Sequence, residues 1–127
     1  MTPPQPSLRV LFVEDHPLFR MALGMLLAST GNVEIAAEAD RGADALARVE
    51  EQEFDLILLD IRLPDMSGID VARELRERGC DTPILVLSMR DESEVRRLLP
   101  AGVSFFSKAA PPEEIAAAVQ RAAQPAG

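Results

Sequence analysis

Five short runs rich in apolar residues are spaced along the chain, and a segment of helical pattern follows each of them. Each run has the length of one β-strand: Leu8–Val13, Val33–Ala39, Leu56–Leu59, Ile84–Leu87 and Val103–Ser107. Continuous apolar runs are typical of strands covered on both faces, as in a parallel sheet. Right-handed crossovers then place helices on both faces of that sheet. The sequence therefore predicts an α/β fold with five parallel strands, in which Val103–Ser107 lies at an edge.

The segments between these runs carry the signals of helices. Pro17–Ser29 begins with a proline, which suits a first helical turn, and it has an apolar stripe at helical spacing made of Leu18, Met21, Ala22, Met25 and Leu26. The other expected helices are Ala43–Glu51, Ser67–Arg78 with Gly79 as its stop, and one that starts at Pro111-Pro112-Glu113-Glu114.

Composition limits the classes of function. A chain of 127 residues with 47% hydrophobic residues can bury the core of one domain, and its net charge of −8 argues against direct binding of a nucleic-acid backbone. The lone Cys80 cannot form an internal disulfide, and Met1–Ser7 is polar and rich in proline, unlike a signal peptide. We therefore expect a cytoplasmic domain in a reducing compartment.

Polar residues stand at the ends of four of the five runs. Glu14-Asp15, Asp60, Ser88 and Lys108 each follow an apolar run. The carboxyl ends of parallel strands meet at one edge of a sheet, where such folds bind their ligands. Three carboxylates, a hydroxyl and an ammonium gathered there suit a divalent cation together with an anionic phosphoryl group.

These residues resemble the motifs of two-component response-regulator receiver domains. The resemblance covers about residues 7–123 and rests on Val13-Glu14-Asp15-His16-Pro17, Asp60-Ile61-Arg62-Leu63-Pro64-Asp65-Met66-Ser67-Gly68, Ser88 and Lys108. It implies a flavodoxin-like, CheY-like (βα)5 three-layer sandwich with strand order 2-1-3-4-5. Asp-His-Pro-Leu-Phe-Arg at 15–20 is similar to the NarL/FixJ (LuxR-type) branch, whose members usually carry a C-terminal helix-turn-helix.

The resemblance also implies a role for each site residue. Asp60 would accept a phosphoryl group from the phosphohistidine of a sensor histidine kinase. Mg²⁺ would be bound by Glu14, Asp15, Asp60 and the backbone carbonyl of Arg62, and Lys108 would pair with the phosphoryl oxygens. Such a domain is a signalling switch and no enzyme, apart from its own phosphorylation and dephosphorylation at Asp60.

The switch itself is expected to use Ser88, whose hydroxyl would bind the phosphoryl group and shift the face made by the fourth helix, fifth strand and fifth helix. Phe105 stands where the family has its switch aromatic, with Phe106 as a rival. The spacing before Lys108 indicates a one-residue deletion ahead of the fifth strand. Pro100 falls in the last turn of the expected fourth helix, so we expect that helix to stop or bend near Leu98.

Four residues have further expected roles. Arg62 and Arg90 flank the path of the attacking water in this family, so we predict that they slow hydrolysis of the phosphorylated state. His16 is interpreted as a helix-start residue, not as a ligand, and Cys80 as structural or incidental.

Residues 7–123 are thus expected to form one receiver domain, with 1–6 a disordered N-terminus and 124–127 the start of a linker. The favoured interpretation is the N-terminal receiver of a DNA-binding transcription regulator, which would homodimerise on phosphorylation and contact DNA only through an output domain outside this chain. No membrane partner is expected.

Four alternatives remain. The first is a stand-alone receiver. The second, a Mg²⁺-dependent phosphohydrolase of the haloacid dehalogenase type, needs a second aspartate where Arg62 stands. The third is a flavodoxin, which needs a phosphate-binding loop rich in hydroxyl residues and glycine after the first strand. Residues 14–20 occupy that place, and they begin with two acidic residues instead. The fourth is a receiver used only for binding, against which the intact acidic set with Lys108 argues.

Overall fold

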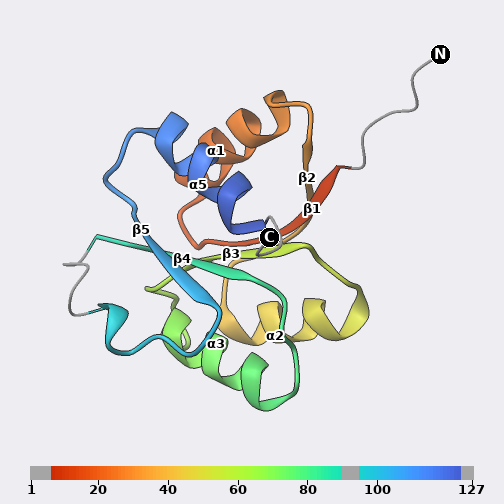
Figure 1. Ribbon diagram of the computed structural model, residues 1–127, viewed down its shortest axis with the longest axis vertical. Coiled ribbons are helices and arrows are strands. Elements are labelled where there is room, and N and C mark those ends of the chain that lie inside the picture. Colours follow the sequence, from red (N-terminus) through yellow and green to blue (C-terminus); the bar gives the residue numbers. More distant parts are fainter. Residues whose placement is uncertain (1–6, 90–94, 124–127) are drawn as a thin grey trace.

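A parallel sheet between two layers of helices makes up the protein (Figure 1). The computed structural model describes residues 7–89 and 95–123. Its elements are β1 (Leu8–Val13), α1 (Pro17–Ser29), β2 (Val33–Ala39), α2 (Gly42–Glu51), β3 (Leu56–Asp60), α3 (Gly68–Glu77), β4 (Ile84–Ser88), β5 (Val103–Ser107) and α5 (Pro112–Ala123). The five strands pair in parallel in the order β2-β1-β3-β4-β5. The predicted fold class, strand order and edge position of β5 are confirmed.

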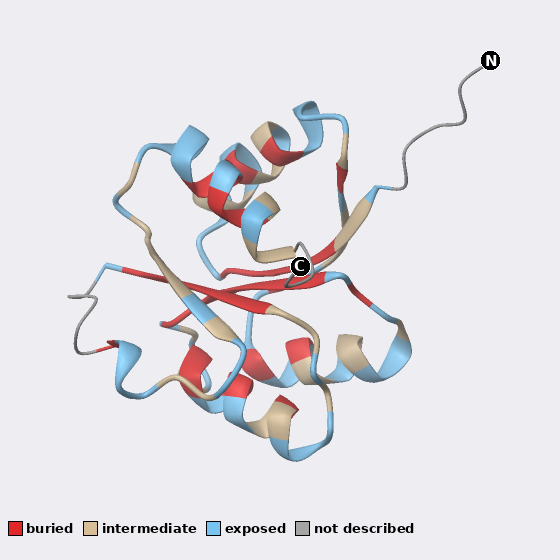
Figure 2. Ribbon diagram, in the orientation of Figure 1, coloured by how far each residue is buried: buried red, intermediate tan, exposed pale blue. Residues whose placement is uncertain are grey.

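Both faces of the sheet are covered, which explains the continuous apolar runs. In Figure 1, α1 and α5 lie on one face, while α2 and α3 lie on the other. Each face has its own hydrophobic core, and every residue of β3 and β4 is buried (Figure 2). Because both sides of these strands are removed from water, alternation between apolar and polar residues would bury polar groups at a cost.

Most of the apolar stripe predicted for α1 lies on the exposed face of the helix, and of its five residues Leu26 alone packs against the core. Leu18, Met21 and Met25 are 80%, 60% and 68% exposed, whereas Leu23 and Leu27 face the core. The helix is apolar on both sides, so its periodicity could not show which side packs on the sheet. None of the described helices is long and apolar enough to span a membrane.

The segment between β4 and β5 has an early helix end. In its described part only Val95 and Arg96 are helical, and the amide of Leu98 donates to the carbonyl of Val95 at 2.9 Å to close a turn. The prediction that the helix ends near Leu98, before Pro100, is confirmed. The beginning of that helix lies outside the described residues, as does Arg90.

A single arginine of α3 fixes the chain after this turn. Arg76 donates through Nε to the carbonyl of Ala101 at 3.0 Å and through Nη2 to that of Gly102 at 3.1 Å. Its Nη1 donates to the carbonyls of Cys80 and Thr82, each at 2.9 Å. Four of the five N–H groups of the guanidinium are thus used on backbone acceptors. Arg76 thereby joins the loops that enter β4 and β5.

Candidate functional site

The predicted polar residues meet at the carboxyl ends of the central strands. Glu14, directly after β1, is fully buried, Asp60 at the end of β3 is 3% exposed, and Ser88 at the end of β4 is fully buried. They are the three buried polar residues in the described part of the chain. Burial of polar side chains amid apolar strands costs free energy, so their position at one edge indicates a functional site.

Lys108 joins two of these carboxylates. Its Nζ donates hydrogen bonds to Glu14 Oε1 and to Asp60 Oδ2, both at 3.0 Å. The same nitrogen lies 4.7 Å from the centroid of the Phe19 ring, which is within range of a cation–π contact. The backbone N–H of Lys108 also donates to the carbonyl of Ser88 at 2.9 Å. The deletion expected before β5 has therefore not displaced the lysine from the site.

The charges of the site shift two pKa values. Burial, followed by the neighbouring charge of Asp60, raises the pKa of Glu14 against the opposing effects of Lys108 and the His16 amide. Burial would lower the pKa of Lys108, but its hydrogen bonds to Glu14 and Asp60 outweigh burial and raise it. One cation thus faces two carboxylates, which leaves the site with an excess of negative charge.

Stability should depend on pH through Glu14. Because its pKa is raised from 4.5, the folded state keeps a proton that the unfolded state has already lost as the pH rises above that value. The free energy of unfolding therefore falls with rising pH from about 4.5 until folded Glu14 also ionises. Glu14→Gln removes this dependence, so its stability relative to wild type should increase across that window. Urea denaturation from about pH 4 to pH 8 in a chelator measures the difference, and a constant difference would contradict the prediction.

Oxygen donors suited to a hard cation are present at the site. Glu14 Oε2 is buried and lies 3.0 Å from Lys108 Nζ, yet none of the described residues donates a hydrogen bond to it. Ligand atoms of Glu14, Asp15 and His16 lie within 4.8 Å of one another. Asp60 is outside this cluster and connects to it through Lys108. The carboxylates of Glu14, Asp15 and Asp60 offer oxygen ligands, which a hard divalent cation such as Mg²⁺ prefers, so the residues fit such an ion.

Arg20, to which the sequence analysis gave no role, holds the loop after β1. It donates through Nη1 to the backbone carbonyl of Glu14 at 2.7 Å, and its Nε lies 2.9 Å from Glu38 Oε2. The signal that could have identified it is its place in the motif at 15–20, one turn into α1. By linking the β1–α1 loop to β2, Arg20 fixes the backbone that carries Glu14.

The loop after Asp60 is fixed by a close approach of α3 and by contacts to α2. The amide of Gly68 donates to the carbonyl of Ile61 at 2.8 Å. Asp65 accepts hydrogen bonds from the backbone amides of Gly42 and Ala43 at 2.7 and 2.9 Å, at the first turn of α2. These amides outweigh the effect of burial and lower the pKa of Asp65.

Gly68→Ala should be destabilising. A Cβ at this position would lie 2.3 Å from the carbonyl oxygen of Asp60 and 2.9 Å from the Cα of Ile61, so backbone would have to move. We expect a loss of about 1–3 kcal/mol in the free energy of unfolding, typical of overpacking. Gly24→Ala in α1 is the matched control, because nothing lies within 4 Å of its Cβ and alanine favours a helix interior. Urea denaturation compares the two variants, and equal stabilities would contradict the prediction.

The remaining predicted residues lie around this site. Arg62 is exposed, and its amide donates to Asp60 Oδ1 at 3.3 Å. Phe105 is half-buried against the core on the α2–α3 face of the sheet, whereas Phe106 packs on the α1–α5 face. The two phenylalanines therefore belong to opposite layers, and Phe105 shares its face with Val95 and the segment before β5.

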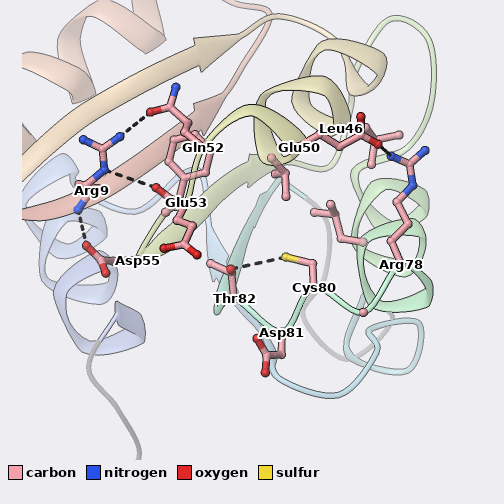
Figure 3. Close-up of a pocket in the computed structure, with 14 residues that line it drawn as sticks. Arg9, Leu46, Glu50, Gln52, Glu53, Asp55, Arg78, Cys80, Asp81 and Thr82 are labelled. Carbon is pink, nitrogen blue, oxygen red and sulfur yellow. Dashed lines mark hydrogen bonds and ion pairs between the residues drawn. The ribbon is translucent and has the colours of Figure 1, made fainter.

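A pocket lies elsewhere, at the opposite ends of the strands (Figure 3). It has a volume of about 1010 Å³. It is lined by residues at the amino ends of β1, β3 and β4 and at the carboxyl ends of α2 and α3. Its arginines are paired: Arg9 donates to Gln52 and Arg78 to Glu50 (Figure 3). It contains none of the predicted site residues, so we place the candidate site at the carboxyl edge of the sheet.

Known proteins match almost the whole chain. The family model of the response regulator receiver domain matches residues 10–120. The response regulator protein VraR of Staphylococcus aureus is 32% identical over 117 residues, which are 91% of this chain and 56% of VraR. The chain thus spans about half the length of the curated relatives it matches.

Solved structures agree. The receiver domain of the response regulator NarL from Mycobacterium tuberculosis has a TM-score of 0.83 and 34% identity, with 94% of this chain and 98% of that one covered. A DNA-binding response regulator of the LuxR family from Staphylococcus aureus shares the fold with a TM-score of 0.83 at 24% identity, covering 92% of this chain and 99% of that one. By sequence and fold, the chain belongs to the response regulator receiver domains of two-component systems.

Proposed function

We propose that the chain is a phosphorylation-dependent switch whose phosphoryl acceptor is Asp60. The observation that carries this proposal is the position of the Lys108 ammonium, 3.0 Å from Asp60 Oδ2 and 3.0 Å from Glu14 Oε1. A carboxylate held next to a fixed cation can attack a phosphorus atom while the cation stabilises the negative charge of the transferred group.

In the proposed reaction, an Asp60 carboxylate oxygen forms a bond to phosphorus as the P–N bond of a kinase phosphohistidine breaks. The electron pair of that bond returns to the imidazole, and the product is an aspartyl phosphate. Lys108 then pairs with the new phosphoryl oxygens, and the protein contributes mainly position and charge.

Mg²⁺ is the proposed cofactor. Glu14, Asp15, Asp60 and the backbone carbonyl of Arg62 would hold it, and when bound it would neutralise charge on the phosphoryl group. The all-oxygen donor set and the burial of Glu14 and Asp60 support this assignment. Exposed Arg62, near the mouth of the site, would hinder the water that hydrolyses the phosphoryl group.

The response would pass from Ser88 to the edge of the sheet. Ser88 lies at the end of β4, next to the site, where its hydroxyl could bind the phosphoryl group. Phe105 and the segment before β5 would form the face that responds. Such a shift needs only a few kcal/mol of differential binding between two states. We further propose that residues 7–123 are the receiver of a longer DNA-binding transcription regulator in the cytoplasm, as the LuxR-family relatives suggest.

Intact-mass measurement after incubation with acetyl phosphate and Mg²⁺ tests the proposal. We expect one phosphoryl adduct on the wild-type chain, stable in acid and labile in base, and none on Asp60→Asn. Asp55→Asn is the matched control, because Asp55 lies at the other end of β3 and should leave the adduct unchanged. An adduct on Asp60→Asn, or none on the wild-type chain in Mg²⁺, would exclude Asp60 as the acceptor.

A further inference from the structure

An aromatic ring of α1 lies against the ammonium of Lys108. The Nζ of Lys108 is over the ring of Phe19, 4.7 Å from its centroid. The same nitrogen is 3.0 Å from both carboxylate oxygens of Glu14 and from Oδ2 of Asp60. The lysine side chain is mostly buried, and a cation–π contact is stronger where the cation is removed from water. The ring is therefore one of the partners that hold this ammonium.

The packing of α1 fixes the ring. Phe19 stands in the first turn of the helix, three residues after its N-cap His16, and is half-buried against the core on the α1–α5 face of the sheet. The next residue, Arg20, donates to the backbone carbonyl of Glu14 at 2.7 Å. The ring thus contacts both the core and the cation, and the helix that carries it is tied to the loop that carries Glu14.

The ring differs from the carboxylates in what happens to it during the proposed reaction. Asp60 gives an oxygen to the new bond with phosphorus, and Mg²⁺ takes carboxylate oxygens as ligands, so both changes weaken the hold of the carboxylates on Lys108. A neutral ring takes no part in either change. Because the lysine stem is flexible, a fixed contact limits where the ammonium can go. The contact with Phe19 can therefore persist while the ammonium passes from the carboxylates to the phosphoryl oxygens.

We propose that Phe19 is a positioning residue, whose ring holds the Lys108 ammonium in place for the phosphoryl group that Asp60 accepts. The inference rests on the proposed function, since it assumes phosphoryl transfer to Asp60. In this role Phe19 acts through the lysine and contacts neither the phosphoryl group nor the metal ion.

The contact has a spectroscopic signature, because Lys108 is the single lysine of the chain. Protons over the face of an aromatic ring are shielded. In the untagged chain labelled at lysine, the ε-CH₂ protons of Lys108 should therefore resonate upfield of their position in the urea-unfolded chain. We expect Phe19→Leu to abolish most of this shift and Phe19→Tyr to keep it. Phe54→Leu is the matched control, because it removes a ring from the core on the α2–α3 face, beside the pocket at the opposite ends of the strands, and should leave the lysine signal unchanged.

Phosphorylation by acetyl phosphate at saturating Mg²⁺ measures the effect on the reaction. Phe19→Leu should slow it by about 3- to 30-fold, the range that the energy of a cation–π contact allows. The Mg²⁺ concentration at half-maximal rate should change less than twofold. Phe19→Tyr and Phe54→Leu should react within twofold of wild type. In the Lys108→Met background, Phe19→Leu should cause no further slowing, because the partner of the ring is gone.

The outcomes separate the two proposals. If the adduct forms as fast in Phe19→Leu as in wild type, or if Phe19→Leu slows the Lys108→Met variant as much as it slows wild type, the role of Phe19 is overturned and Asp60 remains the acceptor. A wild-type lysine signal at its unfolded position would overturn the contact itself. No adduct on the wild-type chain would overturn the proposed function, and this inference with it.

Discussion

Lys108→Met should lose about 3 kcal/mol in the free energy of unfolding when Mg²⁺ is removed by a chelator, as for a buried charge that loses its partner. The Lys108 side chain is 13% exposed, and its ammonium binds Glu14 and Asp60, which are buried at 0% and 3% exposure. Without it, two carboxylates would face each other with no cation, and Glu14 would keep its proton to a higher pH. Mg²⁺ should restore more stability to the variant than to wild type. Urea denaturation with and without Mg²⁺ measures both effects.

A double variant can separate the electrostatic cause of this destabilisation from a simple loss of packing. The double variant Lys108→Met/Asp60→Asn no longer carries the negative charge of Asp60 opposite Glu14. Its loss in the free energy of unfolding should therefore be clearly smaller than that of Lys108→Met alone. Phosphorylation of Lys108→Met by acetyl phosphate should also be slower by about 100-fold or more, as when an electrostatic donor is removed from an active site. If Lys108→Met alone were as stable as wild type in chelator, the ammonium would not compensate the charges of these carboxylates.

Arg76→Met should destabilise the fold by about 2–4 kcal/mol, because four backbone carbonyls lose a charged donor. The acceptors are Cys80 and Thr82 before β4 and Ala101 and Gly102 before β5. Methionine retains most of the apolar part of the arginine side chain. The loss in the free energy of unfolding therefore measures mainly the lost hydrogen bonds. We also expect faster amide hydrogen exchange in residues 98–103, where the helix has already ended before Pro100.

Arg73→Met is the matched control for Arg76. Arg73 lies one turn earlier in α3 and is exposed. To the described residues it makes one hydrogen bond, from Nη2 to the carbonyl of Leu98 at 3.3 Å. Its loss should change the free energy of unfolding by less than about 1 kcal/mol. Equal losses in Arg73→Met and Arg76→Met would contradict the role given to Arg76.

The fold could be predicted because its signals are local. Strands covered on both faces need continuous apolar runs, and the central strands β3 and β4 have such runs. The bounds predicted for Leu8–Val13, Val33–Ala39 and Val103–Ser107 are those that the structure has. Pro100 likewise acts on its own neighbours, since it cannot continue a helix. The buried face of α1 could not be predicted, because that helix has apolar residues on both sides and only the sheet decides which side it covers.

The sequence by itself determined that Glu14, Asp60, Ser88 and Lys108 would meet, because each follows a strand and parallel strands end at one edge. It could not determine which groups bind one another there, since those contacts join residues far apart in the chain. Only the tertiary structure decided that Lys108 lies between Glu14 and Asp60, 94 and 48 residues away from them. It alone placed the guanidinium of Arg76 against the carbonyls of Ala101 and Gly102, 25 and 26 residues away, because long side chains find such partners only after the elements have packed.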